Sequence, residues 1–311
     1  MREDGYVLVV GAAGLDIKAR PTAEPTLEGT SNPGQIRNTV GGVARNIAEN
    51  LARLEIPTVL LSAVGDDQPG QRVLQHAQES GIDVSHVLTV PGARTGEWMG
   101  LMRPDGSLRL AIDDYGITEH ITPQYLNARR KLFAGARMVV IDANLGPRAL
   151  QSLFRLAERY ELPVCADPTS ANLAERLCPY LNRLYMVTPN VRETEALCGV
   201  TVKVSERETA FQAARELTSL GVQVAVITMG MNGLVYAAGA ESGYIPAIRT
   251  EVVDSTGAGD ALTAAVIFGL LNAVPLDEAM RLGVVAASLT LRTRHSVVPN
   301  LSQELLYNQL V

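Results

Sequence analysis

Short, almost wholly apolar runs separated by helical patterns constrain the fold of this chain more than any other feature. An apolar run without polar alternation suits a strand that is covered on both faces, as in a parallel sheet. The runs are Tyr6–Ala12, Pro57–Val64, Arg137–Ile141, Leu162–Ala166, Leu184–Val187 and Val222–Met229. Amphipathic helices are predicted between several of them. This alternation predicts βαβ units and an α/β fold with a mainly parallel central sheet.

Four short segments interrupt the alternation and predict a second, smaller sheet. They are Leu15–Arg20, Gln35–Thr39, Thr95–Met102 and Ser107–Ile112. Pro104-Asp105-Gly106 between the last two is a strong hairpin signal. We interpret residues of about 15–39 and 94–112 as a small β-sheet lid on one domain spanning residues 1–311. An irregular edge of the main sheet is the alternative.

Composition limits the class of partner. The 311 residues are 47% hydrophobic and carry a formal net charge of −6, with no large cluster of Lys or Arg. This balance argues against nucleic acid or an anionic membrane as a partner and favours a small molecule. The three cysteines show no CxxC spacing. We do not expect Met1–Asp4 to begin a signal peptide, because these residues are acidic and lead into a short strand-like run. No apolar run approaches the roughly 20 residues that span a bilayer, so we expect a cytoplasmic protein.

The stretch Asp254–Ile267, D-S-T-G-A-G-D followed by an apolar helix pattern, predicts an anion site. Gly257, Ala258 and Gly259 expose backbone N–H groups at a helix N-terminus, where phosphate or a developing oxyanion is stabilised. Asp260 could accept a proton beside that site, although acidic residues favour the first turn of any helix. Asp254 and Thr256 could supply oxygen atoms to a cation.

Polar residues also gather at the predicted carboxyl ends of the strands, where open α/β sheets bind ligands. Asp142-Ala143-Asn144, Asp167-Pro168-Thr169, Thr188-Pro189-Asn190 and Thr228-Met229-Gly230 occupy these ends. Each Asp or Asn could instead cap a helix.

The N-terminal part offers further candidates. Asp16 follows the first strand, and Gly41-Gly42 leads into a helix that carries Asn46. The ordinary alternatives are a turn carboxylate for Asp16 and a solvated or capping amide for Asn46. Arg45 could contact substrate or phosphate, but the pattern favours an exposed helix arginine.

Together, these motifs resemble the signatures of the ribokinase-like (PfkB) carbohydrate kinase family, from Val7 to about Asn300. The resemblance implies a three-layer α/β/α fold with a small β-sheet lid. It implies Asp260 as the catalytic base and Gly257, Ala258 and Gly259 as the anion hole.

The same resemblance implies the binding residues. Those for the substrate would be Asp16, Gly41, Gly42, Asn46 and Asn144, and those for ATP would be Asn190, Thr228, Gly230 and Gly233. Glu193 of the N-x-x-E motif would hold Mg²⁺ through water, Asp254 and Thr256 could hold a monovalent cation such as K⁺, and the loop 292–298 could border an adenine or monovalent-cation site. A local capping arrangement for Asn190 and Glu193, and a tight turn for Gly230 and Gly233, are the alternatives.

Several segments resemble the pseudouridine kinase branch of this family. They include Ser31–Gly34, Ala111–Asp114 and Asp167–Ala171. The likeness implies transfer of the ATP γ-phosphoryl group to the 5′-hydroxyl of a ribosyl nucleoside, with pseudouridine favoured. Another sugar or nucleoside kinase of the family and a non-catalytic ligand-binding protein are the alternatives. We also expect a homodimer through the lid strands.

Overall fold

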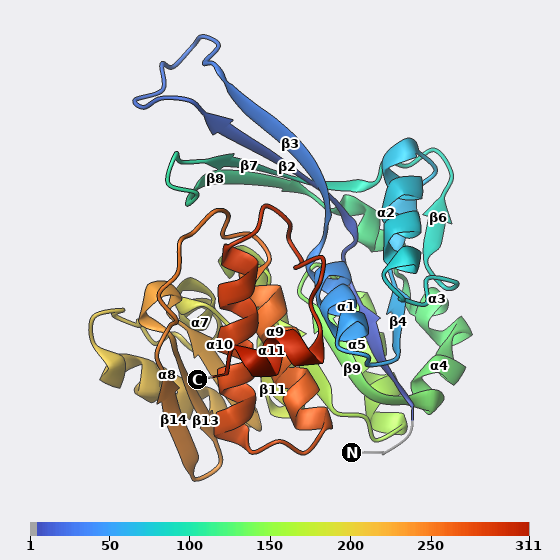
Figure 1. Ribbon diagram of the computed structural model, residues 1–311. Coiled ribbons are helices and arrows are strands. Elements are labelled where there is room, and N and C mark those ends of the chain that lie inside the picture. Colours follow the sequence, from blue (N-terminus) through green and yellow to red (C-terminus); the bar gives the residue numbers. More distant parts are fainter. Residues whose placement is uncertain (1–4, 311) are drawn as a thin grey trace.

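An eight-stranded sheet forms the centre of the computed structural model, which describes residues 5–310 (Figure 1). Its strand order is β14-β13-β12-β11-β10-β9-β1-β4. The parallel strands are β1 (Tyr6–Val10), β4 (Thr58–Leu61), β9 (Ala136–Asp142), β10 (Val164–Asp167), β11 (Met186–Val187) and β12 (Val224–Thr228). β13 (Leu234–Ala238) and β14 (Glu241–Ile245) add an antiparallel edge.

Helices cover both faces of this sheet. One face packs against α3 (Pro123–Ala128), α4 (Arg130–Gly135), α5 (Pro147–Arg159), α7 (Val191–Cys198) and α8 (Arg207–Ser219). The other packs against α1 (Val43–Arg53), α2 (Gln68–Glu79), α9 (Ala258–Leu271), α10 (Leu276–Leu291) and α11 (Gln303–Asn308). Along β1, Leu8 and Val10 enter the first core while Val7 and Val9 enter the second. Burial on both faces explains the continuous apolar runs and confirms the three-layer α/β/α fold.

A separate four-stranded sheet, here called the small sheet, projects from the main body (Figure 1). It consists, in order, of β3 (Gly34–Gly41), β2 (Gly14–Pro21), β7 (Gly96–Met102) and β8 (Leu108–Asp114). β2 pairs with β3 and with β7, and none of its residues joins the main sheet. The alternative of an irregular main-sheet edge is therefore wrong.

The structure differs from the expected elements at several points. The run expected as one strand over Pro57–Val64 divides into β4 and β5 (Ala63–Gly65), and β5 pairs with β6 (Leu88–Val90) in a two-stranded sheet. The sequence analysis did not predict β6, α3, α4 or the short α6 (Ala171–Ala174), whose patterns are too short to show a period. Met1–Asp4 and Val311 lie outside the described residues.

Candidate active site

Asp260 and Asn46 meet where α9 and α1 begin. The Asn46 side-chain amide donates to Oδ2 of Asp260, with Nδ2 and Oδ2 2.6 Å apart. Asp260 lies in the first turn of α9. The residue before this helix is Gly257, which has the left-handed conformation (φ 84°). An added Cβ at Gly257 would lie 2.0 Å from the Ser296 carbonyl oxygen. Only glycine fits this turn, which leads into the start of α9, where the first amides have no partner within the helix.

Asp16 lies beside this pair at the start of the small sheet. Its side chain is buried, and Oδ2 accepts a hydrogen bond from the Ser296 hydroxyl at 2.8 Å. An added Cβ at Gly41 would lie 2.0 Å from Asp16 Oδ1, and one at Gly42 would lie 2.6 Å from the Ala12 carbonyl oxygen. The two glycines are therefore required for the close approach of β3 to the chain around Asp16.

Arg45 is fully buried, so the expectation of an exposed helix arginine is wrong. Its guanidinium donates to the Gly41 carbonyl oxygen at 3.1 Å, to Glu49, and to the side-chain oxygen of Asn46. Because Arg45 bonds to the oxygen of the Asn46 side-chain amide, the nitrogen of that amide is left to point to Asp260. Arg45 thus orients Asn46 toward Asp260.

The electrostatics of the site oppose ionisation of its carboxyl groups. Burial raises the pKa of Asp260 well above its ordinary value, and the nearby Asp167 carboxylate raises it further. Burial likewise raises the pKa of Asp16 and of Asp142. A carboxylate held in this way binds a proton more readily than an exposed one, which suits a group that must accept one.

Tyr115, which the sequence analysis did not single out, also belongs to this region. Its hydroxyl is buried and has no hydrogen-bond partner within the described part of the chain. Burial raises its pKa well above the usual range, with additional contributions from the charges of Asp16, Asp142 and Asp260. Its ring fills the space in front of Gly14, where an added Cβ would lie 2.9 Å from the ring. A buried donor without a partner points to a ligand group that completes the bond.

Asp142, at the carboxyl end of β9, organises the backbone around the site. Its Oδ2 accepts from the Ala12 amide at 2.8 Å and the Ala44 amide at 3.0 Å, and its Oδ1 accepts from the Asn144 amide at 3.0 Å. Asn144 is buried beside it. The Asp142 carboxylate therefore holds together the end of β1, the start of α1 and the turn that carries Asn144.

Gly257–Gly259 are here called the anion loop. A cavity of about 240 Å³ lies between this loop and residues predicted to bind ATP. It is lined by Thr228, Gly230, Gly233, Ala247, Ile248, Ser255, Ala258, Gly259, Leu262, Val284, Ala287, Ser288 and Leu291. Three of the four predicted ATP-binding residues thus meet the first residues of α9. The walls supplied by α10 and by the segment after β14 were missed, because an apolar helix face looks the same in sequence whether it lines a core or a cavity. The loop 292–298 does not line this cavity. Its Ser296 reaches Asp16, its Arg292 lines the adjoining cavity described next, and its Arg294 lines the small pocket that contains Asp254.

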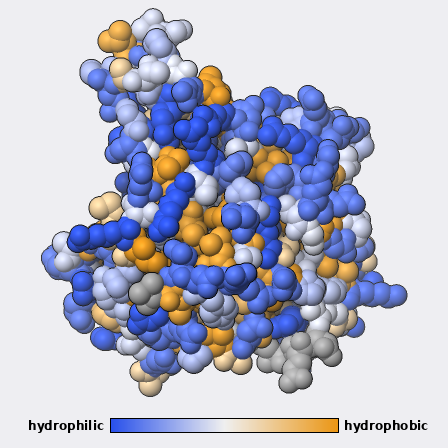
Figure 2. All heavy atoms as spheres, in the orientation of Figure 1, coloured by the Kyte–Doolittle hydropathy of each residue, from blue (hydrophilic) through white to orange (hydrophobic). Residues whose placement is uncertain are grey.

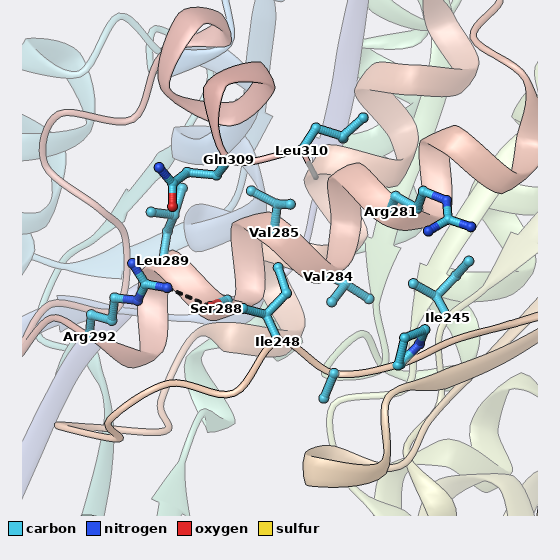
Figure 3. A pocket seen from close by; sticks show the side chains of 12 residues that line it. Ile245, Ile248, Arg281, Val284, Val285, Ser288, Leu289, Arg292, Gln309 and Leu310 are labelled. Carbon is cyan, nitrogen blue, oxygen red and sulfur yellow. Dashed lines mark hydrogen bonds between the residues drawn. The ribbon is translucent and has the colours of Figure 1, made fainter.

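A second cavity of about 240 Å³ adjoins the first along α10. The two share Ala247, Ile248, Val284 and Ser288 as wall residues. Figure 3 shows the apolar side chains of Ile248, Val284 and Val285 gathered around it. In Figure 2 the same side of the molecule exposes apolar atoms over α10, below the projecting small sheet. The region beside the anion loop is therefore an apolar groove that could cover a flat, uncharged ring system.

Asn190 and Glu193 form a capping box at the start of α7, so the local arrangement that the sequence left open is present. The Asn190 side chain accepts from the Glu193 amide at 3.1 Å, and Glu193 accepts from the Asn190 amide at 2.8 Å. Neither residue lines the cavity at the anion loop. Burial raises the pKa of Glu193, and the charge of Asp167 raises it further.

The chemistry of Asp167 and Glu193 fits a divalent cation held through water. Asp167 accepts from the Thr169 amide at 2.8 Å, and Glu193 accepts from Asn190. These hard oxygen donors repel each other when both are ionised, and a hydrated Mg²⁺ would relieve that repulsion. Within residues 5–310 no group of three or more His, Cys, Asp or Glu side chains could hold a metal ion alone.

Asp254 is already engaged by groups of the chain itself. Its Oδ2 accepts from the Lys18 ammonium at 2.9 Å, and its Oδ1 accepts from the Thr256 amide at 2.9 Å. Lys18 was not identified from the sequence, since nothing in a strand of the small sheet marks one lysine as the partner of a residue in a distant loop.

Comparisons with known proteins identify the family of this chain. The model of the pfkB family carbohydrate kinases matches residues 4–302, so this chain belongs to that family, whose members are phosphotransferases with an alcohol group as acceptor. The pseudouridine kinase of Escherichia coli strain K12 is 35% identical over 97% of this chain and 95% of the relative. The guanosine-inosine kinase of Exiguobacterium acetylicum is 30% identical over 95% of this chain and 97% of the relative.

Among solved structures, Arabidopsis thaliana ribokinase complexed with ribose and ATP superposes with a TM-score of 0.84 over 99% of both chains. Its sequence identity of 22% means that this likeness supports the fold alone. Of the helices that the structure describes in residues 5–310, none is both long and apolar enough to cross a membrane.

Proposed function

We propose that this chain transfers the γ-phosphoryl group of ATP to the 5′-hydroxyl of a ribosyl nucleoside, with pseudouridine as the preferred acceptor. The observation that carries the proposal is the Asn46–Asp260 hydrogen bond of 2.6 Å, formed next to the α9 amides that border the cavity at Ala258 and Gly259. The likeness to the E. coli pseudouridine kinase supports the choice of acceptor.

In the reaction, Asp260 accepts the proton of the acceptor hydroxyl. The hydroxyl oxygen forms a bond to the γ-phosphorus while the bond from that phosphorus to the bridging oxygen breaks, and ADP leaves with the bond electrons. The amides of Gly257, Ala258 and Gly259 stabilise the charge on the transferring group. The loose transition state needs positioning and electrostatic stabilisation rather than covalent help, which is what this site provides.

The two cavities along α10 would bind ATP. Thr228, Gly230 and Gly233 lie on the cavity wall with the anion loop, so they would face the phosphates. The apolar groove around Ile248 and Val284 would cover the adenine base. Asn190 would act through the capping box that fixes Glu193. When bound, Mg²⁺ would neutralise charge on the ATP phosphates, and Glu193 with Asp167 would hold it through water.

The acceptor would bind between the small sheet and α1. Asp16 and Asn46 offer an acceptor and a donor for sugar hydroxyl groups. Gly41 and Gly42 would serve the acceptor site by allowing the close approach of the chain to Asp16 and Ala12. Asn144 lies in the turn that Asp142 fixes, and we propose that it contacts the same ligand. The Tyr115 hydroxyl would complete its missing hydrogen bond with the acceptor.

We also propose that the small sheet acts as a lid. Asp16 belongs to β2. A sugar that binds to Asp16 would therefore be covered by the same sheet that supplies this contact. Covering the acceptor keeps water from taking the phosphoryl group in its place.

The test is a panel of acceptors in an assay that measures ADP release. We expect pseudouridine to give the highest kcat/KM, ahead of uridine, inosine, guanosine and ribose. A clear preference for ribose or for a purine nucleoside would replace pseudouridine with that acceptor. If ADP release does not exceed the acceptor-free rate with any compound, the proposal of a catalytic protein is wrong.

A further inference from the structure

Lys18 and Asp254 form a buried ion pair between the small sheet and the segment that leads into the anion loop. The Lys18 Nζ lies 2.9 Å from Asp254 Oδ2, and the two side chains are each 7% exposed. Lys18 belongs to β2, whereas Asp254 begins the loop that leads to α9. The pair therefore joins two segments 236 residues apart in sequence.

The surroundings of Asp254 do not fit the monovalent cation that the sequence led us to expect there. One carboxylate carries one negative charge, and the Lys18 ammonium already neutralises it at hydrogen-bond distance. The second oxygen accepts from the Thr256 amide. An added K⁺ would have to share this carboxylate with a buried like charge, which Coulomb repulsion and incomplete hydration both oppose.

Further basic side chains strengthen this conflict. Arg20, Arg37 and Arg294 line the small pocket of about 50 Å³ that contains Lys18 and Asp254. Four cationic side chains thus face one carboxylate. The positive charge of this pocket repels a mobile cation, so the residues around Asp254 disfavour K⁺ binding.

We propose that the Lys18 ammonium permanently takes the place of a monovalent cation at Asp254, so that phosphoryl transfer by this chain does not require K⁺. This inference rests on the proposed function, because turnover is one of the two quantities that test it. The ammonium neutralises Asp254 next to the anion loop and so leaves the positive end of α9 available to the phosphate.

The same bond couples the small sheet to the reaction centre. Arg20, two residues after Lys18, donates to the Val253 carbonyl oxygen at 2.7 Å, so β2 contacts two successive residues before the anion loop. Asp16, two residues before Lys18, points to the same side of β2 and reaches Ser296. One strand therefore contacts the sugar side and the phosphate side of the site. Unlike a diffusible ion, Lys18 neutralises Asp254 only while β2 lies in place.

The first experiment measures wild-type turnover with Mg²⁺ and tetramethylammonium as the only cations, followed by K⁺, Na⁺ or NH₄⁺ at constant ionic strength. We expect the same turnover in every case. An increase of about tenfold or more on adding K⁺ would overturn the proposal.

The second experiment uses Lys18→Met, which keeps the length of the side chain and removes its charge. Without monovalent cations we expect turnover about tenfold or more below wild type, partly restored by K⁺ or NH₄⁺. Lys203→Met is the matched control, because Lys203 forms an exposed pair with Glu206 at 3.3 Å, and it should behave as wild type. A Lys18→Met variant with normal turnover and no response to K⁺ would contradict the proposed role.

Thermal unfolding of the ligand-free proteins provides a readout that needs no acceptor. K⁺ at constant ionic strength should raise the Tm of Lys18→Met, where Asp254 has lost its cation, and leave the Tm of wild type unchanged. A wild-type Tm that rises with K⁺ as much as that of the variant would show that Lys18 does not fill the site. Because this result does not depend on catalysis, it separates failure of the inference from a wrong choice of acceptor. Should Lys18→Met not fold, the wild-type titrations alone decide between the two outcomes.

Discussion

Asp260 is a carboxyl group whose surroundings oppose its charge. Burial and the Asp167 carboxylate both raise its pKa, while the hydrogen bond from Asn46 stabilises the ionised form. A base is active only when deprotonated, so the raised pKa moves the loss of activity on acidification to higher pH than for an exposed aspartate. The same raised pKa makes Asp260 a better proton acceptor.

The raised pKa of Asp260 predicts the pH dependence of the proposed reaction. The acid limb of kcat/KM should lie well above pH 4, the region where an ordinary aspartate titrates. Asp260→Asn should lower turnover by roughly two to four orders of magnitude, lose that limb, and bind ATP as wild type does. Rate profiles from pH 4 to pH 9 and calorimetric titration with ATP check these points. Near-normal turnover of Asp260→Asn would remove it from the role of base.

Tyr115 allows a second prediction for a single residue. Tyr115→Phe removes a hydroxyl that has no hydrogen-bond partner among residues 5–310, so the Tm should be unchanged or higher. The KM of the acceptor should rise by about tenfold for one lost hydrogen bond. Tyr125→Phe is the matched control, since its hydroxyl donates to the His86 carbonyl oxygen at 2.6 Å. It should lower the Tm and leave the KM unchanged. An unchanged acceptor KM for Tyr115→Phe would show that this hydroxyl does not contact the acceptor.

Among the elements, α9 sets the position of the proposed reaction centre. It is buried along most of its length between α1 and α10. Its Thr263 hydrogen-bonds to Asp167 and Thr188 at the carboxyl ends of β10 and β11. Asp260 in its first turn is buried and accepts the hydrogen bond from Asn46, which ties the start of α9 to α1. Preorganised amides of this kind stabilise charge without reorganising during the reaction.

Gly257→Ala tests whether turnover depends on the exact position of the first turn of α9. An added Cβ would lie 2.0 Å from the Ser296 carbonyl oxygen in a residue with φ 84°, so the first turn of α9 must shift. We expect turnover to fall by about 10² or more with the fold retained, as when an oxyanion donor is lost. Kinetics and circular dichroism measure both effects. Gly146→Ala at the start of α5 is the control, since an added Cβ there meets nothing within 4 Å, and equal losses in both variants would contradict this account.

At the scale of the whole molecule, the outer face of the small sheet carries apolar side chains that no other part of residues 5–310 covers. Ile36, Met99, Leu110 and Ile112 are 74%, 50%, 59% and 65% exposed. The strand register places Met99 opposite Ile112, and Leu101 opposite Leu110. An exposed apolar face of this kind, on a sheet with free edges, supports a homodimer in which two small sheets pack together.

Ile112→Asp tests the homodimer. We expect wild type to sediment as a dimer and Ile112→Asp as a monomer, because burying a carboxylate in an apolar interface is costly. Leu220→Asp is the control, since Leu220 is also exposed (40%) but lies at the end of α8, and it should remain dimeric. Analytical ultracentrifugation at several concentrations measures both. A monomeric wild type would contradict the predicted interface.

The sequence by itself determined the layers of the fold and the identity of most candidate residues. Continuous apolar runs specify strands buried on two faces, and D-S-T-G-A-G-D specifies a helix start with bare amides, because both are local patterns read within one segment. The family resemblance added roles for Asp16, Asn46 and Asp260.

Only the tertiary structure decided which of these residues meet. The bonds from Asn46 to Asp260, from Ser296 to Asp16 and from Lys18 to Asp254 join segments more than 200 residues apart. The sequence pattern misplaced Arg45 on the surface, and it gave no sign of the free hydroxyl of Tyr115. Burial and hydrogen bonding depend on what the rest of the chain packs against a residue, and a local pattern carries no record of that packing.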